Sequence, residues 1–250
     1  MMGLDVVATL RDAWGLFRRD RSLLLRLAGP FLFWPAFALG LLVPTPPLPE
    51  EGVGEATARA SVWIDSVGQW ASHYGGWYFA SYVVGLIGTA ALLALLLSGG
   101  RATVGEALRG AVAIAPRYLL AMILVALPVG AGMLLYILPG LYVAGRLLLV
   151  GPVLLAERRM AAMAALARSI KLTRGVGLPM AALSSCTYLG GMIATQPFLT
   201  MIDLSKGDGP GNPVAIALLQ AGAAAVAMAA GLAQALIAVA AYRRLVNRQL

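Results

Sequence analysis

Six long runs of apolar residues constrain the fold of this chain more than any other feature of its sequence. They cover approximately residues 22–43, 76–98, 117–138, 140–157, 177–201 and 213–241. A helix rises about 1.5 Å per residue, so roughly 20 residues cross a hydrocarbon core about 30 Å thick. Hydrophobic residues make up 60% of the chain and charged residues 12%, too few to cover a water-soluble domain of 250 residues. The sequence therefore predicts an all-α, polytopic membrane protein with six transmembrane helices, forming one integral membrane domain over residues 1–250.

The basic residues lie beside the apolar runs, and nearly all of them fall on one side of the predicted membrane. That side carries Arg11, Arg18, Arg19, Arg21, Arg26, Arg101, Arg109, Arg117, Arg158, Arg159, Arg168, Lys171, Arg174, Arg243, Arg244 and Arg248. The opposite segments carry only Arg59 and Lys206 among several acidic residues. The positive-inside rule then predicts that both termini lie in the cytoplasm. The net charge of +8 reflects this topology and does not indicate a nucleic-acid partner.

Three stretches on the predicted cytoplasmic side resemble one another. They are residues 6–20, 104–118 and 162–175, and they align at Leu10, Leu108 and Leu166. Each stretch precedes two apolar runs, which predicts a threefold internal repeat with units at about 5–98, 103–157 and 160–241. The alternative is that any helix beside a membrane is basic and amphipathic, without a repeat.

In the repeat, each of the three stretches is an amphipathic helix that lies in the plane of the lipid headgroups. Basic residues on such a helix attract anionic lipid of the cytoplasmic leaflet, at about 1 kcal/mol each. The residues expected to meet the headgroups are Arg11, Arg18, Arg109, Arg168 and Lys171. On the outer side, Trp63, Val67 and Trp70 recur at helical spacing. They indicate either a short helix on the outer interface or an extension of the second apolar run.

One permanent cation, Arg146, lies inside the fourth apolar run. If that run begins at an outer turn made by Pro139 and Gly140, Arg146 lies about 9 Å along the helix, in the outer half of the membrane. An unpartnered charge at depth costs at least about 2.5 kcal/mol. Polar residues expected at the same depth are Ser81, Tyr82, Gln196 and Gln220. Together with Arg146 they form a predicted polar cluster, which either binds a lipid headgroup or small anion or links runs four, five and six by hydrogen bonds.

The sequence offers little chemistry for catalysis. Cys186 is the only cysteine and His73 the only histidine, which excludes an internal disulfide and a Cys/His metal cage. Glu157 would need a second carboxylate for acid–base catalysis, and we expect it instead to neutralise Arg158 and Arg159. There is no nucleotide-binding loop of the GxxxxGK type. We therefore expect no catalytic site, metal or cofactor.

The stretch LPGLYVAGRLLLVGPVLLAE, followed by AALARSIKLTRG, resembles a bacterial family of six-span membrane proteins. It is similar to the membrane domain attached to some glycerophosphodiester phosphodiesterases and to its stand-alone YciC-type relatives. The matching residues are Pro139, Gly140, Tyr142, Arg146, Pro152, Glu157, Ala165, Leu166, Ser169, Thr173 and Gly175. The resemblance implies a fold and a location in the bacterial cytoplasmic (inner) membrane. It does not imply hydrolase activity, because nothing in these residues resembles the soluble catalytic barrel of the phosphodiesterases.

Three functions follow from these patterns. The first is a non-catalytic membrane protein that organises, anchors or assists envelope components or lipids, with a membrane-protein partner or a second copy of itself. The second is a transporter, or a carrier of a lipid or small anion, that uses the polar cluster around Arg146. Against this function, no predicted span contains an acidic residue in its interior that would couple transport to the movement of an ion. The third, an enzyme acting on a lipid, is the least favoured because paired carboxylates and histidines are missing.

Overall fold

The structure, a computed structural model, describes residues 4–48, 56–99, 101–157, 160–206 and 211–248. The regular elements of these residues are helical. In chain order they are α1 (Val6–Ala28), the π-helical turn η1 (Gly29–Phe33), α2 (Trp34–Leu42), α3 (Ala56–Ser98), α4 (Val104–Leu135), α5 (Ile137–Leu147), α6 (Val150–Ala156), α7 (Ala162–Leu172), α8 (Gly177–Lys206) and α9 (Pro213–Val246).

Several of these helices are long and apolar enough to cross a membrane. Five segments of the described chain qualify, namely Val6–Leu42, Arg59–Ser98, Val104–Leu135, Ile137–Ala156 and Pro213–Val246. A sixth is reached if α7 and α8, which meet at 112°, count as one span. The predicted all-α class is confirmed for the described residues, and the helices are compatible with a polytopic membrane protein. The number of six spans stays a prediction.

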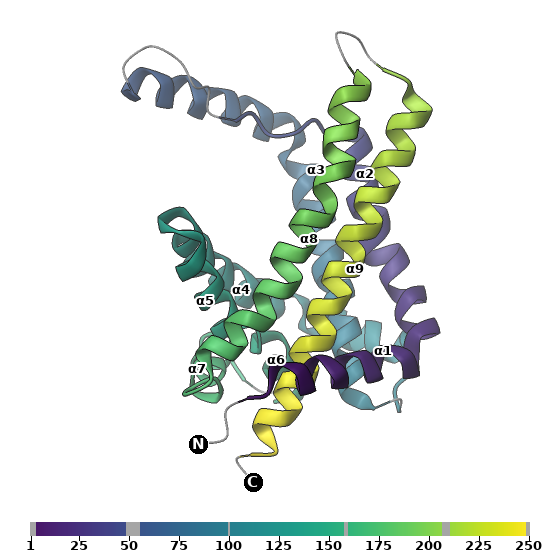
Figure 1. The fold of residues 1–250 in the computed structure, drawn as a ribbon, viewed down its shortest axis with the longest axis vertical. Helices are drawn as coiled ribbons and strands as arrows, with labels where there is room; N and C mark the ends of the chain where they lie inside the picture. The colour runs from purple at the N-terminus through teal and green to yellow at the C-terminus, as the bar shows by residue number, and fades with distance from the viewer. Residues whose placement is uncertain (1–3, 49–55, 100, 158–159, 207–210, 249–250) are drawn as a thin grey trace.

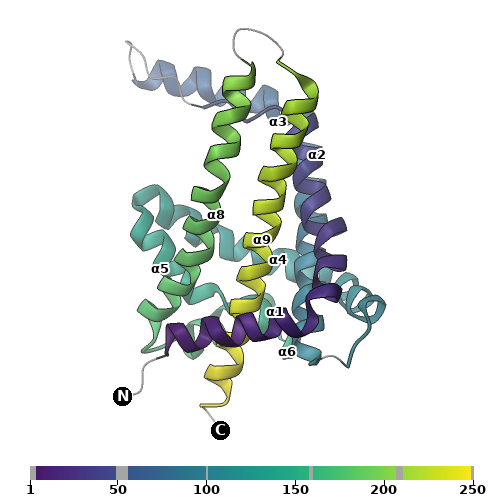
Figure 2. The ribbon, with the colours of Figure 1, turned by 45° about the vertical axis from the view of Figure 1, so that its right-hand side comes forward.

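The bundle has two different ends. Helices α8 and α9 run antiparallel along each other, with α2 and α3 beside α9 (Figures 1 and 2). Both ends of the chain lie at one end of the bundle, together with α6, α7 and the first half of α1 (Figure 1). We call this the basic end, and its basic residues include Arg11 and Arg18 of α1, Arg109 of α4, Arg168 and Lys171 of α7, and Arg243 and Arg244 of α9. At the far end α8 stops and α9 begins.

The core lies in the half of the bundle near the basic end. Its fully buried side chains include Leu92 and Leu96 of α3, Val153 of α6, Met180 of α8 and Val239 of α9. Large apolar side chains towards the far end, such as those of Leu204 and Val214, are exposed. This asymmetry arises because the hairpin of α4 and α5 turns well below the far ends of α8 and α9 (Figures 1 and 2).

The turn between α4 and α5 differs from the one expected. The chain reverses at Tyr136, whose backbone is extended (φ −162°, ψ 151°), while Pro139 and Gly140 lie in the first turn of α5. Proline is tolerated there because the first amides of a helix have no partner within the helix. Two glycines permit the tight return, since a Cβ on Gly132 of α4 would lie 2.9 Å from the Gly140 Cα, and one on Gly140 would lie 2.7 Å from the Met133 nitrogen. The fourth apolar run is also interrupted between α5 and α6, at Leu148 and Leu149.

The helical segment that contains the first apolar run bends just before that run, at Asp20, whose backbone is non-helical (φ −115°, ψ 18°). Its prolines lie farther on, Pro30 within η1 and Pro35 in the first turn of α2. Residues of α1 before Asp20 cross the basic end, and those after it run along the bundle (Figure 2).

The outer tryptophans belong to an extension of the second apolar run. Helix α3 is continuous from Ala56 to Ser98, and its first part projects sideways from the bundle (Figure 1). The indole of Trp63 donates to the carbonyl of Pro47 and that of Trp70 to the carbonyl of Pro44, each at 2.9 Å. The proline-rich segment is therefore held along this part of α3.

The three similar stretches do not share one arrangement. Residues before Asp20 form the crossing part of α1, and residues 162–172 form the separate helix α7. Residues 104–118, by contrast, are the first turns of α4, which begins with a capping box between Thr103 and Glu106. The expectation of a separate interfacial helix is therefore wrong at 104–118. The threefold repeat stays a prediction.

Candidate functional site

Arg146 lies in the last turn of α5 and reaches α7. Its Nε donates to Thr173 Oγ1 at 2.8 Å and its Nη2 to the carbonyl of Ile170 at 2.8 Å. Its Nη1 donates to the hydroxyl of Tyr142, one turn earlier in α5, at 3.1 Å. Ile170 is among the last residues of α7, whose final carbonyls have no partner within the helix and carry partial negative charge. The guanidinium thus caps the C-terminus of α7.

The same contact caps α5 in return. Ser169 Oγ of α7 donates to the carbonyl of Arg146, 2.7 Å away, which is one of the unpaired carbonyls at the end of α5. The Thr173 hydroxyl lies 2.9 Å from the carbonyl of Ser169, so it can donate there while it accepts from Arg146. Ser169 and Thr173 are both fully buried. The ends of two helices therefore satisfy each other through side chains.

The expected partners of Arg146 lie elsewhere. Gln196 is exposed on α8, Ser81 is half-buried and Tyr82 exposed on α3, and Gln220 of α9 packs against Gly40 of α2. The hydrogen bonds of Arg146 join it to α5 and α7 instead. The reason is the position of the α4–α5 turn. Because α5 begins well below the far end, its last turn lies beside α7 at the basic end and not in the outer half of the bundle (Figure 1).

The residues around Arg146 carry a sequence signal, although their proximity was not predicted. Tyr142, Arg146, Ser169 and Thr173 all belong to the pattern on which the family resemblance rests. The hydroxyl of Tyr142 also approaches Gly177 at the start of α8, where an added Cβ would lie 2.7 Å from it. We call Tyr142, Arg146, Ser169 and Thr173 the Arg146 cluster. These four residues join the neighbouring ends of α5, α7 and α8.

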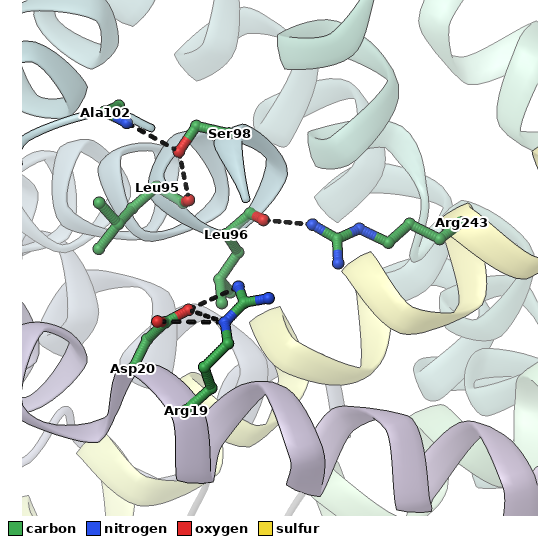
Figure 3. Close-up of polar contacts among 7 residues, drawn as sticks. All are labelled: Arg19, Asp20, Leu95, Leu96, Ser98, Ala102 and Arg243. Carbon is green, nitrogen blue, oxygen red and sulfur yellow. Dashed lines mark hydrogen bonds and ion pairs between the residues drawn. The ribbon is translucent and has the colours of Figure 1, made fainter. Parts of the chain in front are cut away.

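A second set of contacts joins α9 to α3 and α1 at the basic end. Arg243 donates to the carbonyl of Leu96, near the end of α3, at 2.5 Å (Figure 3). Arg244 donates to Asp12 Oδ2 at 2.5 Å and to the carbonyl of Ala8 at 3.1 Å. Two consecutive arginines of α9 thereby hold the end of α3 and the crossing part of α1.

Figure 3 also shows how the bend of α1 and the end of α3 are completed. Arg19 forms an ion pair with Asp20, at the bend of α1, with an Nη2–Oδ2 distance of 2.7 Å. At the end of α3 the hydroxyl of Ser98 donates to the carbonyl of Leu95 and accepts from the amide of Ala102. Gly99 follows with φ +66°, a left-handed conformation that favours glycine at the end of a helix.

The residues predicted to meet lipid headgroups are mostly exposed. Arg11, Arg18, Arg109 and Lys171 are exposed. Arg168 is half-buried, and its Nε donates to Glu157 Oε1 at 3.3 Å. Glu157 therefore neutralises Arg168 of α7, whereas its expected neighbours Arg158 and Arg159 lie outside the described residues. Four of the five predicted side chains are thus accessible to a ligand.

The acidic, histidine and cysteine side chains of the described residues do not gather into a metal site. No group of three or more His, Cys, Asp or Glu side chains among the described residues could hold a metal ion. The structure joins Arg146 to hydroxyls and carbonyls, and the terminal arginines of α9 to carbonyls and a carboxylate. These arrangements link helices and leave exposed cations around them. No protein-family model, curated protein or solved structure matches the chain, so these comparisons add no support to the family resemblance.

Proposed function

We propose that this chain is a non-catalytic protein of the bacterial cytoplasmic membrane that organises, anchors or assists lipids or other envelope components at its basic end. The observation that carries the proposal is the gathering of exposed arginines and lysines at the end of the bundle where both chain termini lie. Such side chains attract anionic lipid headgroups. In this orientation α1 crosses the bundle at the level of the headgroups, as an amphipathic interfacial helix.

The Arg146 cluster supports the same proposal in two ways. Four of the eleven residues that carry the resemblance to YciC-type membrane proteins, Tyr142, Arg146, Ser169 and Thr173, are joined by hydrogen bonds, as expected of residues that serve one structural purpose. The hydrogen bonds of Arg146 to Tyr142, Ile170 and Thr173 support a structural role for the arginine. They favour the non-catalytic organiser over a carrier that would use Arg146 as its anion site.

The orientation is tested with reporters fused to the full chain. A reporter that is active only in the cytoplasm is expected to work after residue 250 and to fail after residue 208, because the basic end faces the cytoplasm. Activity is measured in cells at matched expression, with a reporter active only outside the cytoplasm as the control. The reverse pattern would show that the basic end faces outwards and would contradict the proposal.

The binding of anionic lipid at the basic end is tested by neutralising exposed cations. Arg109→Gln/Lys171→Gln removes two charges from the basic end, and Arg59→Gln/Lys206→Gln removes two from the far side. The first pair is expected to lower the number of phosphatidylglycerol molecules that stay bound to the purified protein, counted by native mass spectrometry. The second pair is expected to leave that number unchanged. Equal losses would mean that the basic end has no special affinity for anionic lipid.

A further inference from the structure

An apolar pocket lies at the corner between α1 and α9. Its volume is about 350 Å³, within the range of small-molecule sites. Leu10, Trp14 and Phe17 line it from the crossing part of α1, and Met228, Leu232 and Leu236 line it from α9. The lining is almost wholly apolar, so the pocket would suit an apolar group.

The bend at Asp20 shapes this pocket. Leu25, which follows the bend, also lines it, so both arms of α1 contribute walls. One arm crosses the basic end and the other runs along the bundle beside α9 (Figure 2). The pocket therefore lies just inside the basic end. In the proposed orientation this is where the protein meets the part of the cytoplasmic leaflet next to the headgroups.

Two arginines stand beside the pocket on the side away from the core. Thr9, Ala13 and Leu16 form the buried face of the crossing part of α1. At about 100° per residue, Arg11 and Arg18 lie on the opposite side of the helix, each next to a residue that lines the pocket. Both arginines are exposed, and they lie two turns apart on one face. An anionic group held by them would be at the mouth of an apolar pocket.

The indole of Trp14, which is apolar with one polar N–H group, lies at the mouth of the pocket. Trp14 lines the pocket and is nevertheless 59% exposed, as an indole at a membrane interface is. From the outside inwards, a ligand would meet two cations, an indole and then aliphatic side chains. That order matches a molecule with a negative head and a long hydrocarbon tail.

We propose that this pocket binds one acyl chain of an anionic glycerophospholipid whose phosphate lies at Arg11 and Arg18. The proposal rests on the function proposed above, because it needs the basic end to lie at a lipid headgroup layer. The proposed function needs only a general attraction between basic side chains and anionic headgroups. The pocket adds a specific site that binds one acyl chain. The crossing part of α1 would then hold one lipid against α9 and order the leaflet around the protein.

The test uses Trp14 as its own reporter in the full-length protein. Phospholipids with brominated acyl chains quench tryptophan on contact, and emission of a Trp14→Phe variant, measured in parallel, isolates the contribution of Trp14. The protein is placed in phosphatidylcholine vesicles that contain a low, fixed fraction of brominated phosphatidylglycerol or of brominated phosphatidylcholine. With two arginines at the mouth, each contributing about 1 kcal/mol, we expect phosphatidylglycerol to bind roughly thirtyfold more tightly.

Two alanines of α9 give a matched pair of variants. Ala229 lines the pocket and Ala227 does not, and both are exposed. Ala229→Phe places a ring in the pocket and is expected to remove the excess quenching by phosphatidylglycerol. Ala227→Phe adds the same ring elsewhere on α9 and is expected to leave it intact. Circular dichroism of both variants checks that the helices are preserved.

The outcomes separate the pocket from the general charge effect. Equal quenching in Ala229→Phe and Ala227→Phe, with phosphatidylglycerol still preferred, overturns the pocket and leaves the proposed function standing. Quenching that Ala229→Phe removes, but that is equal for the two headgroups, overturns the assignment to an anionic lipid and contradicts the proposed function as well. Loss of the headgroup preference in Arg11→Gln/Arg18→Gln, but not in Arg101→Gln/Arg109→Gln, supports the phosphate position.

Discussion

Replacing Gly145 by alanine is expected to lower the free energy of unfolding substantially. Gly145 lies in α5 against α8, and an added Cβ would lie 2.5 Å from the Ala181 nitrogen and 2.6 Å from the Ala181 Cα and the Met180 carbonyl carbon. These atoms are backbone and cannot move without shifting α8. Small residues that let helix backbones touch are a main source of stability in lipid, where apolar burial contributes little.

Two effects of the alanine oppose each other, and the contact decides the sign. Alanine favours a helix over glycine by about 1 kcal/mol. Overpacking costs about 1–3 kcal/mol, occasionally more, and is greatest where the obstructing atoms are rigid. We expect a net loss of roughly 2 kcal/mol, because α5 and α8 must separate along their contact. The loss is measured by unfolding the protein with sodium dodecyl sulfate in mixed micelles, followed by circular dichroism.

Gly190 provides the matched control. It lies inside α8 with no atom within 4 Å of an added Cβ, so alanine there adds only helix propensity. Gly190→Ala is expected to stabilise the protein by at most about 1 kcal/mol. The two glycine-to-alanine changes should therefore have opposite signs. If Gly145→Ala is as stable as Gly190→Ala, the close approach of α5 and α8 does not exist in the membrane.

The sequence was informative about the helices and less so about how they meet. Apolar runs of sufficient length predicted the long helices, because a span has to bury its backbone polar groups within itself. The depth of the α4–α5 turn was not predictable in this way. Tyr136, three residues before the expected Pro139–Gly140 turn, reverses the chain, and local apolarity continues through it.

The contacts of Arg146 were also not predictable from local sequence. A sequence pattern marked Tyr142, Arg146, Ser169 and Thr173, yet the partners expected for Arg146 rested on an assumed depth in the membrane. Two features that no local pattern encodes bring α7 to the end of α5, namely the early turn at Tyr136 and the 112° angle between α7 and α8. The end of the bundle at which the arginines beside the apolar runs gather was easier to predict, since membrane topology constrains where basic residues lie.

Arg146→Gln is expected to destabilise the protein by about 2 kcal/mol. Hydrogen bonds between side chains in membrane proteins contribute about 0.6 kcal/mol each on average and up to about 1.7. Arg146 makes three, to Thr173, Tyr142 and the carbonyl of Ile170. Glutamine is shorter and cannot reach all three, so the C-terminus of α7 would lose its cap. Arg146→Lys keeps the charge but not the planar fork, and we expect an intermediate loss.

Double-mutant cycles separate the observed contacts of Arg146 from the alternative ones. Arg146→Gln and Thr173→Val remove the two sides of one hydrogen bond, so their effects on the free energy of unfolding should be less than additive. Arg146→Gln and Gln196→Leu affect groups on different helices that are not joined, and their effects should add. Additivity with Thr173 together with coupling to Gln196 would mean that α5 lies deeper in the bundle than the structure has it. Full stability of Arg146→Gln, accompanied by loss of a bound anion, would instead make the arginine a ligand site, because its hydrogen bonds would then add nothing to the fold.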